Sequence, residues 1–179
     1  MTGTVPKLET ARLELVATTL EHLRVELETP ERLGEALQAV VPPSWPPGLY
    51  DRDAMRYFHG RLLELGDAGV GWYGWYAIRR AELGQSRFLV GAVGFMGPPA
   101  GDGSVEIGYS IAPEARGQGY ATEIVGALVD RAFHAASVQR VLAETHETNA
   151  PSIRALERHG FVRIGPGREP GHVRFERQR

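Results

Sequence analysis

The glycine-rich stretch at residues 116–122, RGQGYAT, lies between a predicted strand and a predicted helix. The strand covers residues 105–111, and the amphipathic spacing of the apolar residues that follow the stretch predicts the helix. The first turn of a helix exposes N–H groups at the positive end of its dipole, and Gly117 and Gly119 lack a Cβ that would keep a phosphate away. We therefore expect a pyrophosphate-binding loop here; the alternative is a turn that only connects strand and helix.

Two common phosphate sites do not match this loop. A Walker-type loop needs Gly-Lys-Ser/Thr, and no lysine stands in residues 116–122. A dinucleotide fingerprint needs a third glycine, where this chain has Thr122, and it normally opens a βαβ unit near the start of a domain. A nucleoside triphosphate and a dinucleotide are therefore disfavoured as ligands.

A second segment downstream also has the form of a strand followed by a helix. Residues 141–145 read as a strand, and Asn149 and Pro151 are residues typical of a helix start. Gly160 is typical of a helix end, so a helix is expected between them.

The two segments together resemble the GCN5-related N-acetyltransferases (GNAT). The pattern Arg-x-x-Gly-x-Ala at 116–121 is similar to the acetyl-CoA signature of that family, and Asn-x-x-Ser at 149–152 followed by Gly-Phe at 160–161 is similar to its C-terminal half. Glu-Ile-Gly-Tyr at 106–109 and Ala-Thr-Glu at 121–123 resemble its ribosomal-protein acetyltransferase branch, the RimJ/RimL type.

The resemblance implies one α+β domain over residues 8–178, with a mixed, mostly antiparallel sheet flanked by helices. It implies acetyl-CoA as co-substrate, with the pantetheine arm along residues 109–111, where a strand bulge would free an oxyanion-binding N–H near Ile111. The side chains of Tyr109 and Ile111 are expected only to pack in the core. The residues expected to bind acetyl-CoA are Ser110, Ile111, Arg116, Gly117, Gln118, Gly119, Tyr120, Ala121, Thr122, Asn149 and Ser152.

Acetyl transfer requires a neutral amine. At pH 7 about one-tenth of an α-amino group is neutral, but less than about one-thousandth of a lysine side chain, so a base matters more for lysine. Glu144 stands five residues before Asn149, where the resemblance places a catalytic glutamate, and Glu106 on the neighbouring strand is the second candidate. Either carboxylate can act through a water chain, be merely exposed, or bind the substrate's ammonium group.

The chain departs from the family at the acid that protonates the leaving thiolate. Many members carry a tyrosine seven residues after the asparagine, and this chain has Leu156 there. Ser152 is the nearest replacement, although capping of its own helix is an equal alternative. A coenzyme A thiol has a pKa near that of free cysteine, about 8.5, so a strong acid is not required.

The composition indicates a soluble, cytoplasmic domain that binds no polyanion. The chain has 179 residues, 42% of them hydrophobic, a net charge of −2 and no cysteine. Thiolate metal sites and an acetyl-cysteine intermediate are thereby excluded; we expect no metal, no nucleic acid and no membrane segment, and consider a homodimer possible.

The remaining elements follow from local signals. Thr18 and Glu21 have the spacing of a capping box for a helix to Leu27, and a second helix is expected over 29–40. Five aromatic residues form either an acceptor wall or, more commonly, core: Trp45, Tyr50, Trp72, Tyr73 and Trp75. Strands are expected at 13–16, 72–79, 88–95 and 172–175, and the arginine-rich stretch 168–179 has an exposed character.

These features predict an N-acetyltransferase in which the amine attacks acetyl-CoA directly in a ternary complex. The acceptor stays open among a protein N-terminus, an amino acid, a polyamine and an antibiotic. The alternative is a non-catalytic acyl-CoA-binding or regulatory module, since Leu156 replaces the expected acid.

Overall fold

An eight-stranded mixed sheet forms the centre of the computed structural model, which describes residues 5–179. The strand order is β1-β2-β3-β4-β5-β6-β8-β7, and β5 and β6 form the parallel pair among otherwise antiparallel neighbours. The expected mixed, mostly antiparallel α+β fold is confirmed. The strands are β1 Lys7–Glu9, β2 Leu13–Ala17, β3 Gly74–Arg79, β4 Phe88–Phe95, β5 Ser104–Ile111, β6 Arg140–His146, β7 Val162–Pro166 and β8 His172–Gln178.

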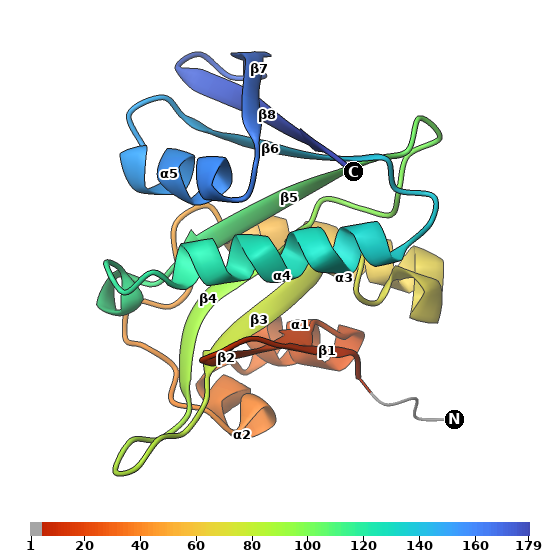
Figure 1. The fold of residues 1–179 in the computed structure, drawn as a ribbon. Helices are drawn as coiled ribbons and strands as arrows, with labels where there is room; N and C mark the ends of the chain where they lie inside the picture. Colours follow the sequence, from red (N-terminus) through yellow and green to blue (C-terminus); the bar gives the residue numbers. More distant parts are fainter. Residues whose placement is uncertain (1–4) are drawn as a thin grey trace.

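Helices cover both faces of the sheet (Figure 1). On one face lie α4 (Tyr120–His134) and α5 (Ala150–Arg158), and on the other α1 (Leu20–Glu28), α2 (Leu33–Leu37) and α3 (Arg52–Leu65). Short 3₁₀ turns occupy Pro30–Arg32, Gly66–Gly69 and Pro113–Ala115.

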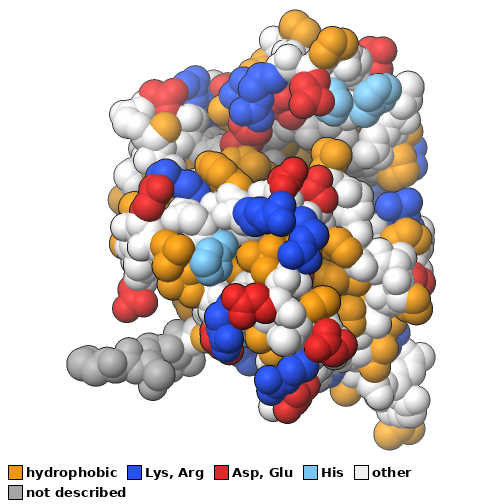
Figure 2. Space-filling view, turned by 180° about the vertical axis from the view of Figure 1, so that it is seen from behind, with side chains coloured by type: hydrophobic (Ala, Val, Ile, Leu, Met, Phe, Trp, Pro, Cys, Tyr) orange, Lys and Arg blue, Asp and Glu red, His pale blue; other side chains and the backbone are white. Residues whose placement is uncertain are grey.

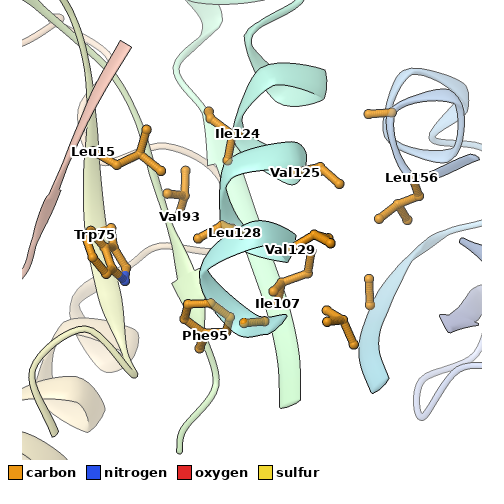
Figure 3. Close-up of a cluster of buried hydrophobic side chains, with 14 of the residues drawn as sticks. Leu15, Trp75, Val93, Phe95, Ile107, Ile124, Val125, Leu128, Val129 and Leu156 are labelled. Carbon is orange, nitrogen blue, oxygen red and sulfur yellow. The ribbon is translucent and has the colours of Figure 1, made fainter. Parts of the chain in front are cut away.

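The largest core lies between the sheet and α4 (Figure 3). Ile124 and Leu128 of α4 are fully buried against strand residues such as Leu15 and Trp75. Side chains alternate along a strand, so Val16 packs instead in the cluster beneath α1 and α2. Burial of each such aliphatic side chain contributes roughly 1.5–3 kcal/mol, so α4 is anchored firmly enough to hold the loop before it in place.

The first two helices differ from the sequence-based expectation. Thr19, not Thr18, caps α1, and its capping-box partner is His22, not Glu21. Thr18 directly follows β2, and its N–H still donates to the Gly74 carbonyl, so α1 is capped one residue later. The expected helix over 29–40 is also wrong: a 3₁₀ turn precedes α2, which ends where Gln38 adopts a left-handed conformation at φ 50°.

The C-terminal segment is also more integrated than expected. The strand expected at 172–175 continues to Gln178 and lies between β6 and β7. Its arginines are not a free tail: Arg177 donates to the His159 carbonyl at 2.6 Å, and Arg179 to the Ala135 carbonyl at 2.7 Å. The strand expected to start at residue 72 begins at Gly74.

A buried carboxylate joins α1 to the loop that follows α2. Glu26 is only 3% exposed and accepts hydrogen bonds from Trp45 Nε1 at 2.8 Å and from the hydroxyls of Tyr50 and Tyr76, both at 2.6 Å. Burial raises the pKa of Glu26, and the three donors oppose that rise by stabilising the carboxylate. The group therefore holds the loop around residues 45–50 against the sheet.

We expect Glu26→Gln to lower the free energy of unfolding by about 1–3 kcal/mol, because an amide cannot accept all three hydrogen bonds. Denaturant unfolding would measure the loss. Glu28→Gln on the same helix, whose side chain is 63% exposed, is the control and is expected to change little. An unchanged midpoint for Glu26→Gln would contradict the stabilising role of the cluster.

Candidate active site

Strands β5 and β6 separate in the middle of the sheet. They pair from Ser104 and Arg140 to Ile107 and Ala143, and beyond these residues the pairing stops while β5 stays paired with β4 through Ile111. Hydrogen-bonding directions alternate along a strand, so the N–H groups of residues 109 and 111 point away from β4 into the gap. The bulge expected at this place is wrong; the divergence of the strands frees the same groups.

The loop 116–119 leads from β5 into α4 with the geometry of an anion cradle. Gly117 and Gly119 have φ values of 76° and 79°, which glycine adopts without strain. Gly119 is the N-cap of α4, and no side chain caps the helix, so its first N–H groups are available. A Cβ at Gly117 would meet no atom within 4 Å, which leaves room for a phosphate at this backbone.

Arg12, directly before β2, bonds to both the loop 116–119 and the first turn of α4. Its Nε donates to Glu123 in the first turn of α4 at 2.9 Å, and its Nη1 donates to the Gln118 carbonyl at 2.9 Å. Burial raises the pKa of Glu123, but hydrogen bonds from Thr10 and Arg12 outweigh it and hold the pKa below its usual value. Because Arg12 balances this carboxylate, the cradle keeps its attraction for anions.

The start of α5 lies beside the gap, on the same face of the sheet as α4. Asn149 caps this helix and accepts from the Ser152 N–H at 3.3 Å, so the cap is the asparagine and not the serine hydroxyl. Ser152 is 7% exposed, and its hydroxyl lies 2.7 Å from the hydroxyl of Tyr109. Leu156 is buried in the core. The expectation that the Tyr109 side chain only packs is therefore wrong, because its hydroxyl reaches the α5 side of the gap.

A pocket of about 610 Å³ opens on the opposite face of the sheet, between α3, β4, β5 and the turn 167–171. Figure 2, which shows the molecule from this side, has apolar side chains around a hollow, with acidic, basic and histidine side chains gathered along one edge. Tyr57 and Phe58 of α3 provide apolar walls, and Glu106 and Glu144 provide charge. Ser110 points here and not toward the cradle, although the sequence grouped it with the acetyl-CoA residues.

The two candidate catalytic carboxylates meet across β5 and β6. Arg168 bridges them, with an ion pair to Glu106 and its Nε 3.1 Å from Glu144. The backbone N–H of Arg168 also donates to the Glu144 carboxylate at 3.0 Å, and Nη1 of Arg174 lies 3.4 Å from the same carboxylate. The glutamate side chains are 16% and 11% exposed, but that of Arg168 is 63% exposed. Two arginines thus balance two carboxylates at the pocket wall.

The other residues predicted to bind acetyl-CoA lie at the cradle or on its supports. Arg116 donates from Nε to the Ile111 carbonyl at 3.1 Å, which ties the loop to β5. The Gln118 side chain bonds to the Glu114 carbonyl at 3.4 Å. The Tyr120 ring lies under Arg12 at 4.5 Å and is buried, and Ala121 and Thr122 complete the first turn of α4.

The five aromatic residues expected to form an acceptor wall or core are mostly core. Tyr50, Tyr73 and Trp75 are buried, and Trp45 is partly buried against two core clusters. Trp72 stacks under Arg131 at 4.4 Å, and Tyr50 alone among these five borders the pocket.

The described residues contain no group of three or more side chains arranged to hold a metal ion. Within residues 5–179, no helix is both long enough and apolar enough to span a membrane.

The chain is similar in sequence to known acetyltransferases. The family model described as Acetyltransferase (GNAT) domain matches residues 12–162. YjdG of Bacillus subtilis (strain 168), named as an uncharacterized N-acetyltransferase, is 26% identical over 155 residues, which cover 87% of this chain and 89% of YjdG. The N-acetyltransferase p20 of Bacillus licheniformis is 32% identical over 77 residues, 43% of each protein.

Solved structures share the fold. RimL, a ribosomal L7/L12 alpha-N-protein acetyltransferase in complex with coenzyme A, superposes with a TM-score of 0.67 at 16% identity, over 97% of this chain and 98% of RimL. RimJ of Mycobacterium smegmatis, in complex with CoA-disulfide, superposes with a TM-score of 0.62 at 18% identity, over 98% of this chain and 87% of RimJ. With the family match spanning most of its length, the chain belongs to the GNAT family of N-acetyltransferases.

Proposed function

We propose that this protein transfers the acetyl group of acetyl-CoA to a primary amine by direct attack in a ternary complex. The observation that carries the proposal is the separation of β5 from β6 beyond Ile107 and Ala143, with the loop before α4 on one side of it and the pocket on the opposite face of the sheet. A thioester threaded through this gap would present its carbonyl to an amine in the pocket. The RimL and RimJ structures, solved with forms of coenzyme A, support this route by analogy of fold.

Each catalytic requirement has a candidate group. The N–H of Ile111, which points into the gap, would donate to the oxygen that becomes negative in the transition state. Glu144 would accept the amine proton directly or through water, with Glu106 as the second candidate. Ser152 at the start of α5 would face the leaving sulfur.

We propose an α-amino group as the acceptor, within the RimJ/RimL-type branch. About one-tenth of an α-amino group is already neutral at pH 7, against less than about one-thousandth of a lysine side chain, so an α-amino acceptor asks less of Glu144 than a lysine side chain would. RimL acts on the α-amino group of the ribosomal protein L7/L12, and this supports a peptide N-terminus as acceptor over an amino acid, a polyamine or an antibiotic.

Thiol release from acetyl-CoA in the presence of an amine panel tests the proposal. The panel contains N-terminal peptides, free amino acids, polyamines and aminoglycosides, and we expect turnover with a peptide. Thermal shift with acetyl-CoA against NAD tests the ligand class first. Binding of acetyl-CoA without transfer to any amine would favour the non-catalytic acyl-CoA-binding module instead.

We expect Arg12→Ala to weaken acetyl-CoA binding about tenfold, since it leaves the Glu123 carboxylate unbalanced beside the pyrophosphate, ~1.4 kcal/mol. Titration calorimetry measures the affinity, and circular dichroism verifies the fold. Arg24→Ala, which removes an exposed arginine paired with Glu21 on α1, is the matched control. Equal affinities for the two variants would contradict a role of Arg12 in acetyl-CoA binding.

A further inference from the structure

The leaving thiolate has one candidate donor, Ser152, in the place where many relatives carry a tyrosine on α5. Leu156 fills that tyrosine's position and is 1% exposed, so it belongs to the core and cannot contact the sulfur. The backbone N–H of Ser152 is taken by Asn149 at 3.3 Å, which leaves the hydroxyl as the polar group that Ser152 can offer. What that hydroxyl can do depends on where its single proton points.

The direction of the Ser152 hydroxyl proton depends on its neighbour, Tyr109 on β5. The two hydroxyl oxygens are 2.7 Å apart, across the place where β5 and the start of α5 flank the gap, and Tyr109 also borders the acceptor pocket. A serine hydroxyl has one proton and two lone pairs. If the phenol donates to a lone pair of Ser152, the serine proton is free to point elsewhere, and the donated bond makes that proton a better donor.

Tyr109 stays protonated and can therefore donate a hydrogen bond to the Ser152 oxygen. Burial raises its pKa to about 12, although the bond with Ser152 partly opposes the rise. The phenol therefore keeps its proton at neutral pH. A phenol with so high a pKa would not give its proton up to a thiolate, so Tyr109 acts by orientation and not by proton loss.

We propose that Tyr109 is a positioning residue that turns the Ser152 hydroxyl proton toward the sulfur of coenzyme A. The inference rests on the proposed function and adds a residue to it. When the tetrahedral intermediate collapses, the C–S bond breaks and its electron pair stays on sulfur, where the Ser152 hydrogen bond stabilises the thiolate. The amine proton leaves through the carboxylates to water, and the thiolate takes its proton from water, so the overall reaction balances.

Tyr109→Phe removes the phenol oxygen and keeps the ring. We expect kcat to fall about tenfold to a hundredfold, the scale of a hydrogen bond to a charged group, with acetyl-CoA affinity unchanged and the protein still folded. Tyr73→Phe, which removes a buried hydroxyl bonded to Arg61 at 3.2 Å, is the control and is expected to keep kcat.

A second readout does not depend on turnover. The ultraviolet absorbance of the thiolate reports the pKa of the thiol in bound coenzyme A, and we expect that pKa to be higher by about one unit in Tyr109→Phe and in Ser152→Ala. In the Ser152→Ala background, Tyr109→Phe is expected to have no further effect on kcat or on the thiol pKa. Such non-additivity is the signature of one residue acting through the other.

The inference is overturned if Tyr109→Phe leaves both kcat and the thiol pKa at wild-type values, or if its full effect persists without the Ser152 hydroxyl. A wild-type protein that binds coenzyme A but acetylates no amine would refute the proposed function alone, because the thiol titration still tests the hydrogen bonds. Failure to bind coenzyme A by calorimetry would overturn both.

Discussion

Replacing Glu144 by Gln is expected to lower kcat by about 10²–10⁴-fold, the usual cost of losing a general base. The amide keeps the size of the side chain and part of its hydrogen bonding to Arg168 and Arg174 but cannot take the amine proton. Steady-state kinetics with the best amine of the panel measure the change. Acetyl-CoA affinity should survive, because Glu144 lies at the pocket and not at the phosphate cradle.

Three comparisons make this result interpretable. Glu176→Gln on β8 is the matched control, because Glu176 is also a mostly buried strand carboxylate paired with an arginine, Arg140 at 3.5 Å, but lies outside the pocket lining. If Glu144→Gln also removes the acidic limb of the pH–rate profile, Glu144 is the group that titrates. If it keeps kcat while Glu106→Gln loses it, the base lies on β5.

Unchanged kcat in both variants would mean that the amine arrives neutral or loses its proton to water. That outcome would favour an acceptor of low pKa, such as a peptide N-terminus, over a lysine side chain. The arginine pairs around both carboxylates make this outcome a real alternative, because the carboxylate oxygens are already engaged by Arg168 and Arg174.

Features encoded within short stretches of sequence were predicted well. The strand, loop and helix around residues 116–122 follow from alternation, two glycines and a 3.6-residue period, all of which are local. The same holds for the start of α5 at Asn149 and Pro151. The family resemblance added the order in which these pieces assemble, and the fold confirms it.

Features made by distant residues could not be predicted. Arg12 and Glu123 are 111 positions apart, and Arg168 and Glu106 are 62 apart. The sequence around one residue of such a pair does not indicate which distant residue it will contact. The contact of Tyr109 with Ser152 forms where β5 no longer pairs with β6, and the sequence of β5 alone does not show where that pairing stops.

Strand β7 was missed for a different reason. Its residues, Val162–Pro166, are almost all exposed at the edge of the sheet, the alternation of apolar and polar residues covers only three positions, and Gly165 and Pro166 after them are typical of a turn. Its existence depends on pairing with β8, which the chain reaches only after the turn at 167–171.

Gly119→Val is expected to weaken acetyl-CoA binding at least tenfold, ~1.4 kcal/mol or more, because a branched side chain would occupy the space of a phosphate. In the free protein the new Cβ would meet only Arg12 Nη2, at 3.6 Å, so the folded state has room for it. The remaining cost is the left-handed backbone at φ 79°, about 1–2 kcal/mol of strain for a residue with a Cβ. The variant should therefore fold, with a lower melting temperature and poor binding.

Gly84→Val separates these two effects. Gly84 has φ 80° in the β3–β4 hairpin, and a Cβ there would meet no atom within 4 Å, so the substitution brings the same backbone strain outside the loop before α4. We expect both variants to lose similar stability, measured by thermal unfolding, while calorimetry shows weakened acetyl-CoA binding for Gly119→Val alone. If a folded Gly119→Val protein binds acetyl-CoA as tightly as Gly84→Val does, the loop before α4 is a connection between strand and helix and the phosphates bind elsewhere.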